Sequence, residues 1–319
     1  MAKHHYVPVF YLRKFCDPRY PALQEPYLWV GKRSEPGWKK RAPKNVAFKT
    51  GLYSIHGDDV SDPEFVEKTF NLIETDMAGL YRTRLDFAEL PRDRKERSIL
   101  AHFVGLFVIR SPFYRGLLAS MMEQTAAMHR KVLGGTPGAL ESAVHRIEAE
   151  TGKGFGMPLQ DFRRALLDER LKLKANPEVV TALALQQWEQ ISWILFCMRW
   201  RLLVASSGTH FISSDSPAFW QDPTPRPPFL AGHGLMMKNI EVVLPLSRNL
   251  CFLARWGRAT GIYAATSWQM IELINRTVAW STDEVYSPAP FPRSNIGKPA
   301  QRLLYDEWLS GPPRHRTAS

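Results

Sequence analysis

The chain has 319 residues, of which 45% are hydrophobic, and 42 basic against 31 acidic residues give it a formal net charge of +11. This apolar content excludes a disordered chain, and no window approaches the run of about 18 apolar residues that a membrane span requires. The start of the chain lacks the apolar core of a signal peptide, so we expect a soluble, cytoplasmic protein with no membrane partner. The positive charge fits an anionic partner, such as nucleic acid or a phosphorylated small molecule, as well as a surface that is merely basic.

The first 60 residues predict loops and short strands. Residues 27–30 are aromatic and β-branched and lie between Pro26 and Gly31, which is typical of a strand. Residues 51–55 predict a second strand, and a polar loop rich in Lys and Arg separates the two.

A helical pattern follows over residues 61–206. Ser61-Asp62-Pro63-Glu64 is typical of a helix start, because a capping residue precedes a proline and an acid in the first turn. Apolar residues at spacings of three and four then predict one buried face up to Leu80. Further helices are predicted over residues 91–109, interrupted at Ser111-Pro112, and over 121–132, 140–150, 159–174 and 176–202, the last of them central and buried.

Strands return after Gly208, over residues 209–213, 240–244 and 250–254, before a last helix over 267–279. The predicted fold class is therefore α+β, with a mainly helical bundle inserted between N-terminal and C-terminal β elements that form one small mixed or antiparallel sheet. We expect one compact domain over residues 1–287, made of segments 1–60, 61–206 and 207–287, and a Pro- and Arg-rich tail over 288–319.

Several familiar signals are missing. There is no P-loop, no Gly-x-Gly-x-x-Gly, no His-Glu-x-x-His and no Gly-x-Ser-x-Gly, which disfavours nucleotide-dependent motors, Rossmann dehydrogenases and α/β-hydrolases. Cys16, Cys197 and Cys251 are odd in number and widely spaced, so they predict buried, reduced thiols rather than a disulfide framework or a zinc knuckle. Most Trp and Phe residues fall at core spacing, so we predict no base-stacking platform.

The segment from His4 to Phe15, His-His-Tyr-Val-Pro-Val-Phe-Tyr-Leu-Arg-Lys-Phe, is the most distinctive part of the sequence. It resembles the N-terminal motif of a microbial family catalogued as domain of unknown function 4238. The other matching segments are Lys44-Asn45-Val46-Ala47, the Tyr53 strand, Glu74, Arg110-Ser111-Pro112, Ile212 to Pro217, Leu244 to Ser247 and Asn275-Arg276. Ser216 departs from the family's usual Asn. The resemblance implies kinship over most of the chain and no particular activity.

Histidines and carboxylates are the candidate catalytic residues. Imidazoles can ligate a metal, shuttle a proton or bind a phosphate, and neighbouring strand residues such as His4 and His5 point to opposite faces and so differ in role. Asp215 follows a strand, where it either faces a cleft or caps a turn. Glu74 on the first long helix is either a second acid or an ion-paired helix residue.

Basic residues provide the candidate phosphate-binding groups. Arg110 lies in a strongly apolar run and needs a partner, which could be Glu74, Asp215 or a ligand anion. With Arg13 and Lys44 it is a candidate anion clamp. Two further groups of basic residues either contact a nucleic-acid backbone outside the site, as outer tracks, or are ordinary solvent-exposed faces. They are residues 39–41 and the basic residues of 163–174.

Three functional hypotheses follow from these groups. In the first, the protein is a nuclease-like enzyme that hydrolyses phosphodiesters. His4, His5 and Asp215 hold a divalent metal (Mg²⁺, Mn²⁺ or Zn²⁺) that activates water, and the anion clamp stabilises the charge that develops on the phosphate. In the second, the same residues form a pocket that binds or senses a nucleotide or another anionic ligand without turnover. In the third, His4, Arg110 and Asp215 form a buried structural network. The sequence predicts no oligomeric state.

Overall fold

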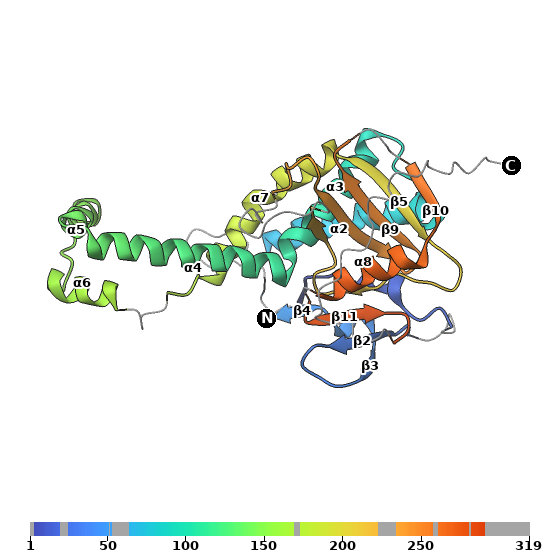
Figure 1. Cartoon of the computed structure of the whole chain (residues 1–319), viewed down its shortest axis with the longest axis horizontal. Coiled ribbons are helices and arrows are strands. Elements are labelled where there is room, and N and C mark those ends of the chain that lie inside the picture. Colours follow the sequence, from blue (N-terminus) through green and yellow to red (C-terminus); the bar gives the residue numbers. More distant parts are fainter. Residues whose placement is uncertain are drawn as a thin grey trace. The chain divides into compact units, whose positions relative to one another are not determined.

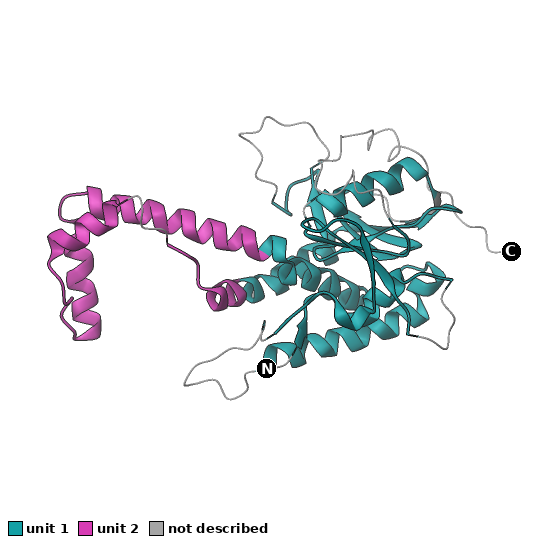
Figure 2. Cartoon of the chain, turned by 90° about the horizontal axis from the view of Figure 1, so that it is seen from below, with its two compact units in different colours: residues 1–114, 184–319 teal, residues 115–183 magenta. Residues whose placement is uncertain are grey.

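The structure is a computed structural model that describes residues 3–19, 25–50, 52, 64–168, 173–222, 234–257, 261–280 and 282–290. The chain divides into two compact units, one formed by residues 1–114 and 184–319 and the other by residues 115–183 (Figure 2). The unit boundaries differ from the segment boundaries predicted from the sequence, and most of the predicted tail lies outside the described residues. The class is α+β, as predicted.

Most helices begin and end close to the predicted positions, but the helix predicted over 121–132 begins at Pro112 and the helix predicted over 159–174 ends at Leu167. Asp93 caps the second long helix, where its carboxylate accepts a hydrogen bond from the Glu96 backbone N–H at 2.8 Å. The break predicted at Ser111-Pro112 separates this helix from the next. The helices are α1 (Val9–Leu12), α2 (Phe65–Thr83), α3 (Arg94–Arg110), α4 (Pro112–Gly135), α5 (Ala139–Thr151), α6 (Leu159–Leu167), α7 (Pro177–Cys197) and α8 (Trp268–Trp280), with 3-10 turns η1 (Arg13–Phe15), η2 (Pro43–Asn45) and η3 (Leu85–Phe87).

The helix predicted over residues 176–202 is too long. It ends at Cys197, and Arg199–Ala205 forms the strand β5. The error has a physical cause, since a segment that is apolar on all sides fits a buried strand as well as a buried helix.

The larger sheet has five strands in the order β10 (Gly261–Thr266), β5, β9 (Leu250–Arg255), β8 (Glu241–Ser247) and β7 (Phe219–Gln221) (Figure 1). The β10–β5 pair is parallel and the other pairs are antiparallel. Helix α8 packs on this sheet, and their common core includes Leu203, Val243, Leu253, Ile274 and Val278.

A second sheet joins distant parts of the chain. Its four strands are ordered β3 (Trp38–Arg41), β2 (Leu28–Lys32), β11 (Glu284–Ser287) and β6 (Ser213–Ser214), and all pairs are antiparallel. A third sheet pairs β1 (Lys3–His5) with β4 (Phe48–Thr50). The described residues therefore form three sheets in place of the single one predicted. N-terminal and C-terminal strands do meet, where β11 lies between β2 and β6.

Several strands differ from their predicted positions. The strand expected over 209–213 is reduced to β6, and the strand expected over 51–55 lies mostly outside the described residues. The polar stretch that the sequence predicts as a loop contains β3, whose Lys and Arg side chains conceal its strand character.

The N-terminal segment is anchored on the larger sheet. The Tyr11 hydroxyl donates to the Pro245 carbonyl at 2.6 Å and lies 3.1 Å from Ser213 Oγ. The Arg248 N–H donates to the Lys14 carbonyl at 3.1 Å. Tyr11 also packs against Phe15 and Phe107, with ring centroids 5.1 and 4.6 Å away. These contacts fix the start of the chain, where chains ordinarily fray.

The smaller unit holds α5, α6 and the adjoining parts of α4 and α7. Leu140 and Val144 of α5 are buried, and Arg163 of α6 pairs with Glu141 of α5 at 2.7 Å. In the part of the chain that the structure describes, no helix is both long enough and apolar enough to cross a membrane.

Candidate functional site

The two histidines of β1 have different partners, as expected for neighbours on a strand. His4 is 1% exposed, and its Nε2 lies 2.7 Å from the Glu64 carboxylate. His5 Nε2 donates to the Lys44 carbonyl at 3.3 Å, because a carbonyl can only accept, and the His5 ring lies 5.6 Å from that of Phe48. Burial lowers the pKa of His5, partly offset by this hydrogen bond, so the ring is neutral at pH 7.

Arg110 and Glu74 form a buried ion pair beneath the histidines. Arg110 is 2% exposed, and its guanidinium donates to the Glu74 carboxylate at 2.5 Å and to the His5 carbonyl. It also lies 4.7 Å from the centroid of the Phe70 ring. The half-buried Glu67 lies in the field of Arg110 and His4, and burial raises its pKa. Of the three predicted partners of Arg110, the structure shows Glu74.

Asp215 lies in a separate hydrogen-bonded turn. Its carboxylate accepts hydrogen bonds from the Thr282 hydroxyl and from the backbone N–H groups of Asp283 and Glu284 at 3.1 and 3.2 Å. The Asp215 N–H in turn donates to the Glu284 carbonyl at 3.0 Å. Burial raises the Asp215 pKa to about 6, although these hydrogen bonds oppose the shift. The carboxylate thus joins the β6 turn to the start of β11, and its hydrogen bonds do not include either histidine.

The proposed metal ligands are therefore not gathered into one set. His4 faces Glu64, His5 faces Lys44, and Asp215 faces the start of β11. Over the described residues, no three His, Cys, Asp or Glu side chains are grouped so that they could hold a metal ion.

The three members of the expected anion clamp also have separate environments. Arg110 is buried against Glu74, whereas Arg13 is exposed on η1. The Lys44 ammonium extends to Glu25, 2.8 Å away, and both of these side chains are largely exposed. The structure thus brings together His5, Glu74 and Arg110. Lys44 contacts His5 only through its backbone carbonyl, and Arg13 and Asp215 have other surroundings.

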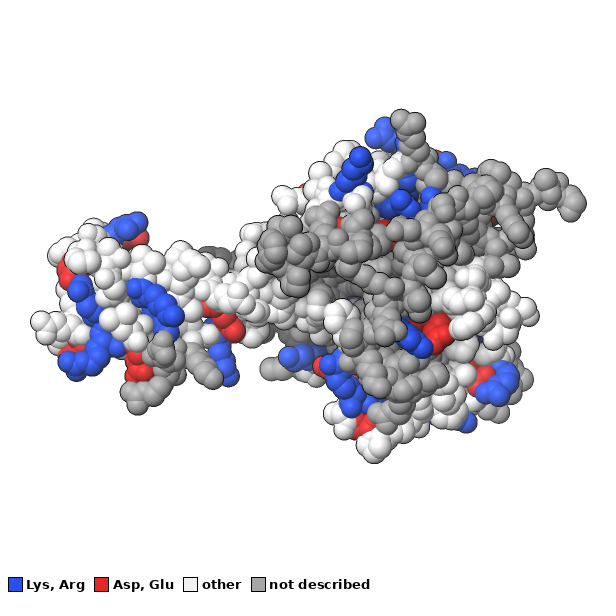
Figure 3. All heavy atoms as spheres, in the orientation of Figure 1, with Lys and Arg blue, Asp and Glu red and all other residues white. Residues whose placement is uncertain are grey.

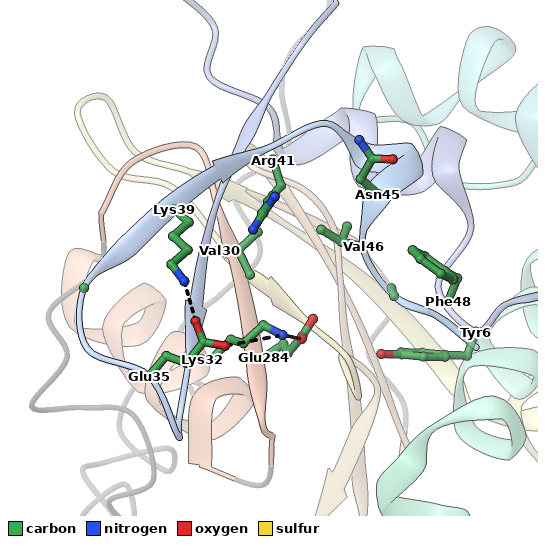
Figure 4. Close-up of a pocket in the computed structure, with 12 residues that line it drawn as sticks. Tyr6, Val30, Lys32, Glu35, Lys39, Arg41, Asn45, Val46, Phe48 and Glu284 are labelled. Carbon is green, nitrogen blue, oxygen red and sulfur yellow. Dashed lines mark hydrogen bonds and ion pairs between the residues drawn. The ribbon is translucent and has the colours of Figure 1, made fainter. Parts of the chain in front are cut away.

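An open pocket of about 390 Å³ lies on one face of the four-stranded sheet (Figure 4). It is lined by Tyr6, Val30, Lys32, Glu35, Gly37, Lys39, Arg41, Asn45, Val46, Ala47, Phe48 and Glu284. Two of the motif segments noted in the sequence, one with Tyr6 and one with Asn45 to Ala47, thus form part of its wall. Its volume is in the range of small-molecule sites, roughly 300–1,000 Å³.

Strand alternation explains which basic side chains reach the pocket. Successive residues of a strand point to opposite faces, so Lys39 and Arg41 of β3 line the pocket while Lys40 points away from it. The Lys40 ammonium lies over the rings of Tyr27 and Trp29, 4.5 and 5.1 Å from their centroids. The run 39–41 is therefore divided between two faces and does not form a single basic track.

The pocket carries three cations and two carboxylates. Lys32 pairs with Glu284 at 2.7 Å, and this hydrogen bond raises the pKa of Lys32. Lys39 pairs with Glu35 at 2.6 Å, and this hydrogen bond lowers the pKa of Glu35. Arg41 is exposed, and among the described residues no hydrogen bond or ion pair engages its guanidinium.

The wall opposite these ion pairs has an unusual backbone. Ala47 has a φ of +53°, in the left-handed region that residues with a Cβ rarely adopt. Its carbonyl accepts a hydrogen bond from the Tyr6 N–H at 2.9 Å, which ties the two motif segments together. Figure 4 shows the side chains of Tyr6 and Phe48 side by side at this wall, with the Tyr6 hydroxyl directed into the cavity.

Sequence reasoning missed most of this pocket. It weighed Lys39 and Arg41 only as part of a basic track, and it did not single out Tyr6, Lys32 or Glu284. Residues 38–41 read Trp-Lys-Lys-Arg and show no alternation of apolar and basic side chains, so they gave no local signal for a strand. Sequence reasoning also missed Glu64 as the partner of His4, because the sequence analysis considered that residue only as an acid in the first turn of a helix.

Comparison with known proteins identifies the family of the chain but no characterised relative. Residues 3–280 match the family described as "Protein of unknown function (DUF4238)". Neither the curated proteins nor the solved structures contain a match. Because the matched region covers most of the sequence, including both motif segments at the pocket, the chain belongs to the DUF4238 family.

Proposed function

We propose that the protein is a binding module that takes a small anionic ligand, bearing a phosphate or a carboxylate, in the pocket on the four-stranded sheet. The observation that carries this proposal is the Arg41 guanidinium, which lines the cavity in the field of Glu35 but forms no hydrogen bond or ion pair with the described residues. A guanidinium presents a planar fork of donors that matches both phosphate and carboxylate.

The charge of the pocket supports an anion. Lys32 and Lys39 are each neutralised by a carboxylate, so the cavity keeps the one positive charge of Arg41. The two ion pairs fix the neighbouring side chains, which limits the entropy lost when a ligand binds. The Asn45 amide at the same wall offers both donors and an acceptor for polar groups of the ligand.

The Ala47 backbone supports a role for this wall beyond packing. A residue with a Cβ in the left-handed region costs of order 1–3 kcal/mol, and such residues concentrate at functional sites. Among the described residues other than glycine, only Ala88 also has a positive φ. The energetic cost of the left-handed conformation at Ala47 is consistent with a pocket wall shaped for a ligand.

Calorimetric titration with ribose 5-phosphate and with inorganic phosphate tests the proposal. Arg41→Gln should weaken binding at least 10-fold, because a hydrogen bond to a charged group contributes about 1.5–3 kcal/mol. Lys40→Gln is the matched control, since it removes the same charge from the opposite face of β3. Equal affinities of the two variants, or no binding by the parent, would contradict the proposal.

Phosphodiester hydrolysis stays a prediction from the sequence. Incubating the parent with DNA and RNA in Mg²⁺, Mn²⁺ or Zn²⁺ tests it, with Asp215→Ala and His4→Ala as variants. Cleavage that both variants lose would favour an enzyme. Ligand binding without cleavage would favour the binding module.

Nucleic acid as a partner also stays a prediction. On the face drawn in Figure 3, the basic side chains are interrupted by acidic and neutral ones. Several basic residues of the expected tracks are ion-paired, since Lys39 pairs with Glu35, Arg163 with Glu141, and Arg164 with Asp161 at 3.7 Å. We therefore favour a small ligand, which needs only a local charge.

A further inference from the structure

A second cavity, of about 530 Å³, lies between α3 and α7, apart from the pocket described above. Helix α3 contributes Arg94, Lys95, Ser98 and His102, and helix α7 contributes Glu189, Ser192, Trp193 and Phe196. Apart from the neighbours Arg94/Lys95 and Ser192/Trp193, successive residues of each set are three or four positions apart, so each set lies on one face of its helix. All of them belong to the larger unit. We call this cavity the α3/α7 groove.

The groove has an exposed aromatic platform. Trp193 is 62% exposed, and its ring is nearly parallel to that of Phe196, at 8° with centroids 5.6 Å apart. Arg97 fixes Phe196, because its guanidinium donates to the Phe196 carbonyl at 2.8 Å and lies 5.4 Å from the ring centroid. Trp193 thus presents a large flat surface that is already ordered. The sequence predicted no such platform, because Trp193 lies in a helix that it took to be buried.

A directed hydrogen-bond acceptor also lines the groove. His102 Nδ1 lies 2.8 Å from the Ser98 carbonyl, which can only accept, so Nδ1 carries the hydrogen. In the neutral ring Nε2 is then an acceptor, and no described residue donates to it. The His102 ring is held edge-on to Trp188, with centroids 5.6 Å apart. His102 is therefore set to receive an N–H from a ligand.

Positive charge lies at one end of the groove. Arg94 and Lys95 are exposed in the first turn of α3, and in the described parts of the chain neither forms an ion pair. His102 follows Arg94 by eight residues, which is about 12 Å along a helix. The cationic end adjoins the aromatic platform, because Arg97, which follows Arg94 and Lys95 in the same turn of α3, lies 5.4 Å from the Phe196 ring, whereas His102 lies against Trp188. Glu189 on the facing helix can accept hydrogen bonds from hydroxyl groups.

We propose that the α3/α7 groove binds a nucleotide, with the base stacked on Trp193, a base N–H bound to His102 Nε2, and the phosphate near Arg94 and Lys95. This proposal is independent of the ligand proposed for the pocket at Arg41. Stacking on an exposed aromatic ring is tolerant of the base, so the proposal concerns the class of ligand and not one base.

Calorimetric titration with adenosine and with AMP tests the groove. Adenosine carries no anionic group, so its binding does not depend on Arg41. A failure of the proposal for the α3/α7 groove is therefore distinguishable from a failure of the proposal for the pocket at Arg41. Trp193→Ala should weaken adenosine binding about 10-fold, while Trp193→Phe should retain most of the affinity. Trp268→Ala is the matched control, because Trp268 is 58% exposed and lies on α8.

A second pair of variants tests the cationic end. Arg94→Gln combined with Lys95→Gln should reduce AMP affinity to that of adenosine and leave adenosine affinity unchanged. The proposal is overturned if the parent does not bind adenosine at millimolar concentration, or if Trp193→Ala binds it as tightly as Trp268→Ala does. Circular dichroism of each variant checks that the fold is retained.

Discussion

Breaking the Arg110–Glu74 pair should destabilise the larger unit strongly. Glu74→Gln removes the carboxylate but keeps the shape of the side chain, and it takes from the Arg110 guanidinium, which is 2% exposed, the carboxylate that lies 2.5 Å away. Loss of one partner of a buried ion pair costs about 3–5 kcal/mol. Because Glu74 is itself 18% exposed and water can partly replace it, we expect a cost near the lower end, about 3 kcal/mol.

A second ion pair provides the matched control. Arg276 and Glu272 on α8 also lie 2.5 Å apart, but their side chains are 37% and 34% exposed. Solvent-exposed pairs contribute about 0–1 kcal/mol, so Glu272→Gln should cost less than about 1 kcal/mol. Since both pairs belong to the larger unit, the two variants report on the same unfolding transition.

Urea-induced unfolding, followed by circular dichroism, measures both costs from the transition midpoint. Equal costs for the two variants would refute the argument that burial, rather than distance, determines the strength of the pair. The double variant Glu74→Leu with Arg110→Met adds a further test. It should cost less than the sum of the two single changes, because it removes both charges of the pair together.

Three further predictions concern Asp215, two glycines and the thiols. The raised Asp215 pKa, about 6 when folded against 3.8 ordinarily, contributes stability that is full below pH 4 and is lost as the pH rises through 6. Relative to Asp215→Asn, the parent should therefore lose up to about 3 kcal/mol of unfolding free energy between pH 4 and 7, as measured by urea titration. The same dependence of the unfolding free energy on pH in both proteins would contradict this. Gly105→Ala should lower the unfolding free energy by about 1–3 kcal/mol, since the added methyl group would lie 2.6 Å from Ser192 Oγ. Gly79→Ala meets nothing within 4 Å and should be neutral or stabilising in the same assay. A thiol reagent should modify exposed Cys197 quickly and the other two cysteines, which are buried, only after unfolding; three equal rates would contradict the fold.

Helices were more predictable than strands because their signals are local. The proline at residue 112 and the apolar periodicity over 66–80 each lie within one or two turns of the element that they define. The strands β3 and β11 depend on partners far along the chain, and β3 carries basic residues that resemble a loop. The prediction of buried thiols was wrong at Cys197, which is exposed at the end of α7.

The candidate sites were likewise predictable where they depend on helices and not where they depend on strand pairing. Arg110 was recognised as a buried cation that needs a partner, and Glu74 was among the partners considered, because both residues lie on predictable helices. The pocket at Arg41 depends on which face of β3 each side chain takes and on Glu284, which comes from the other end of the chain. Without the strand pairing, no local pattern identifies those residues as neighbours.

The position of β11 has a consequence for the order in which the strands can pair while the chain is being synthesised. Residues 284–287 pair with residues 29–32 on one side and with residues 213–214 on the other. A nascent chain leaving the ribosome must therefore hold its β2–β3 hairpin with one edge unpaired until about 250 further residues have been synthesised. During that time the open edge could accept another strand, which makes it a place where chaperones would be expected to act.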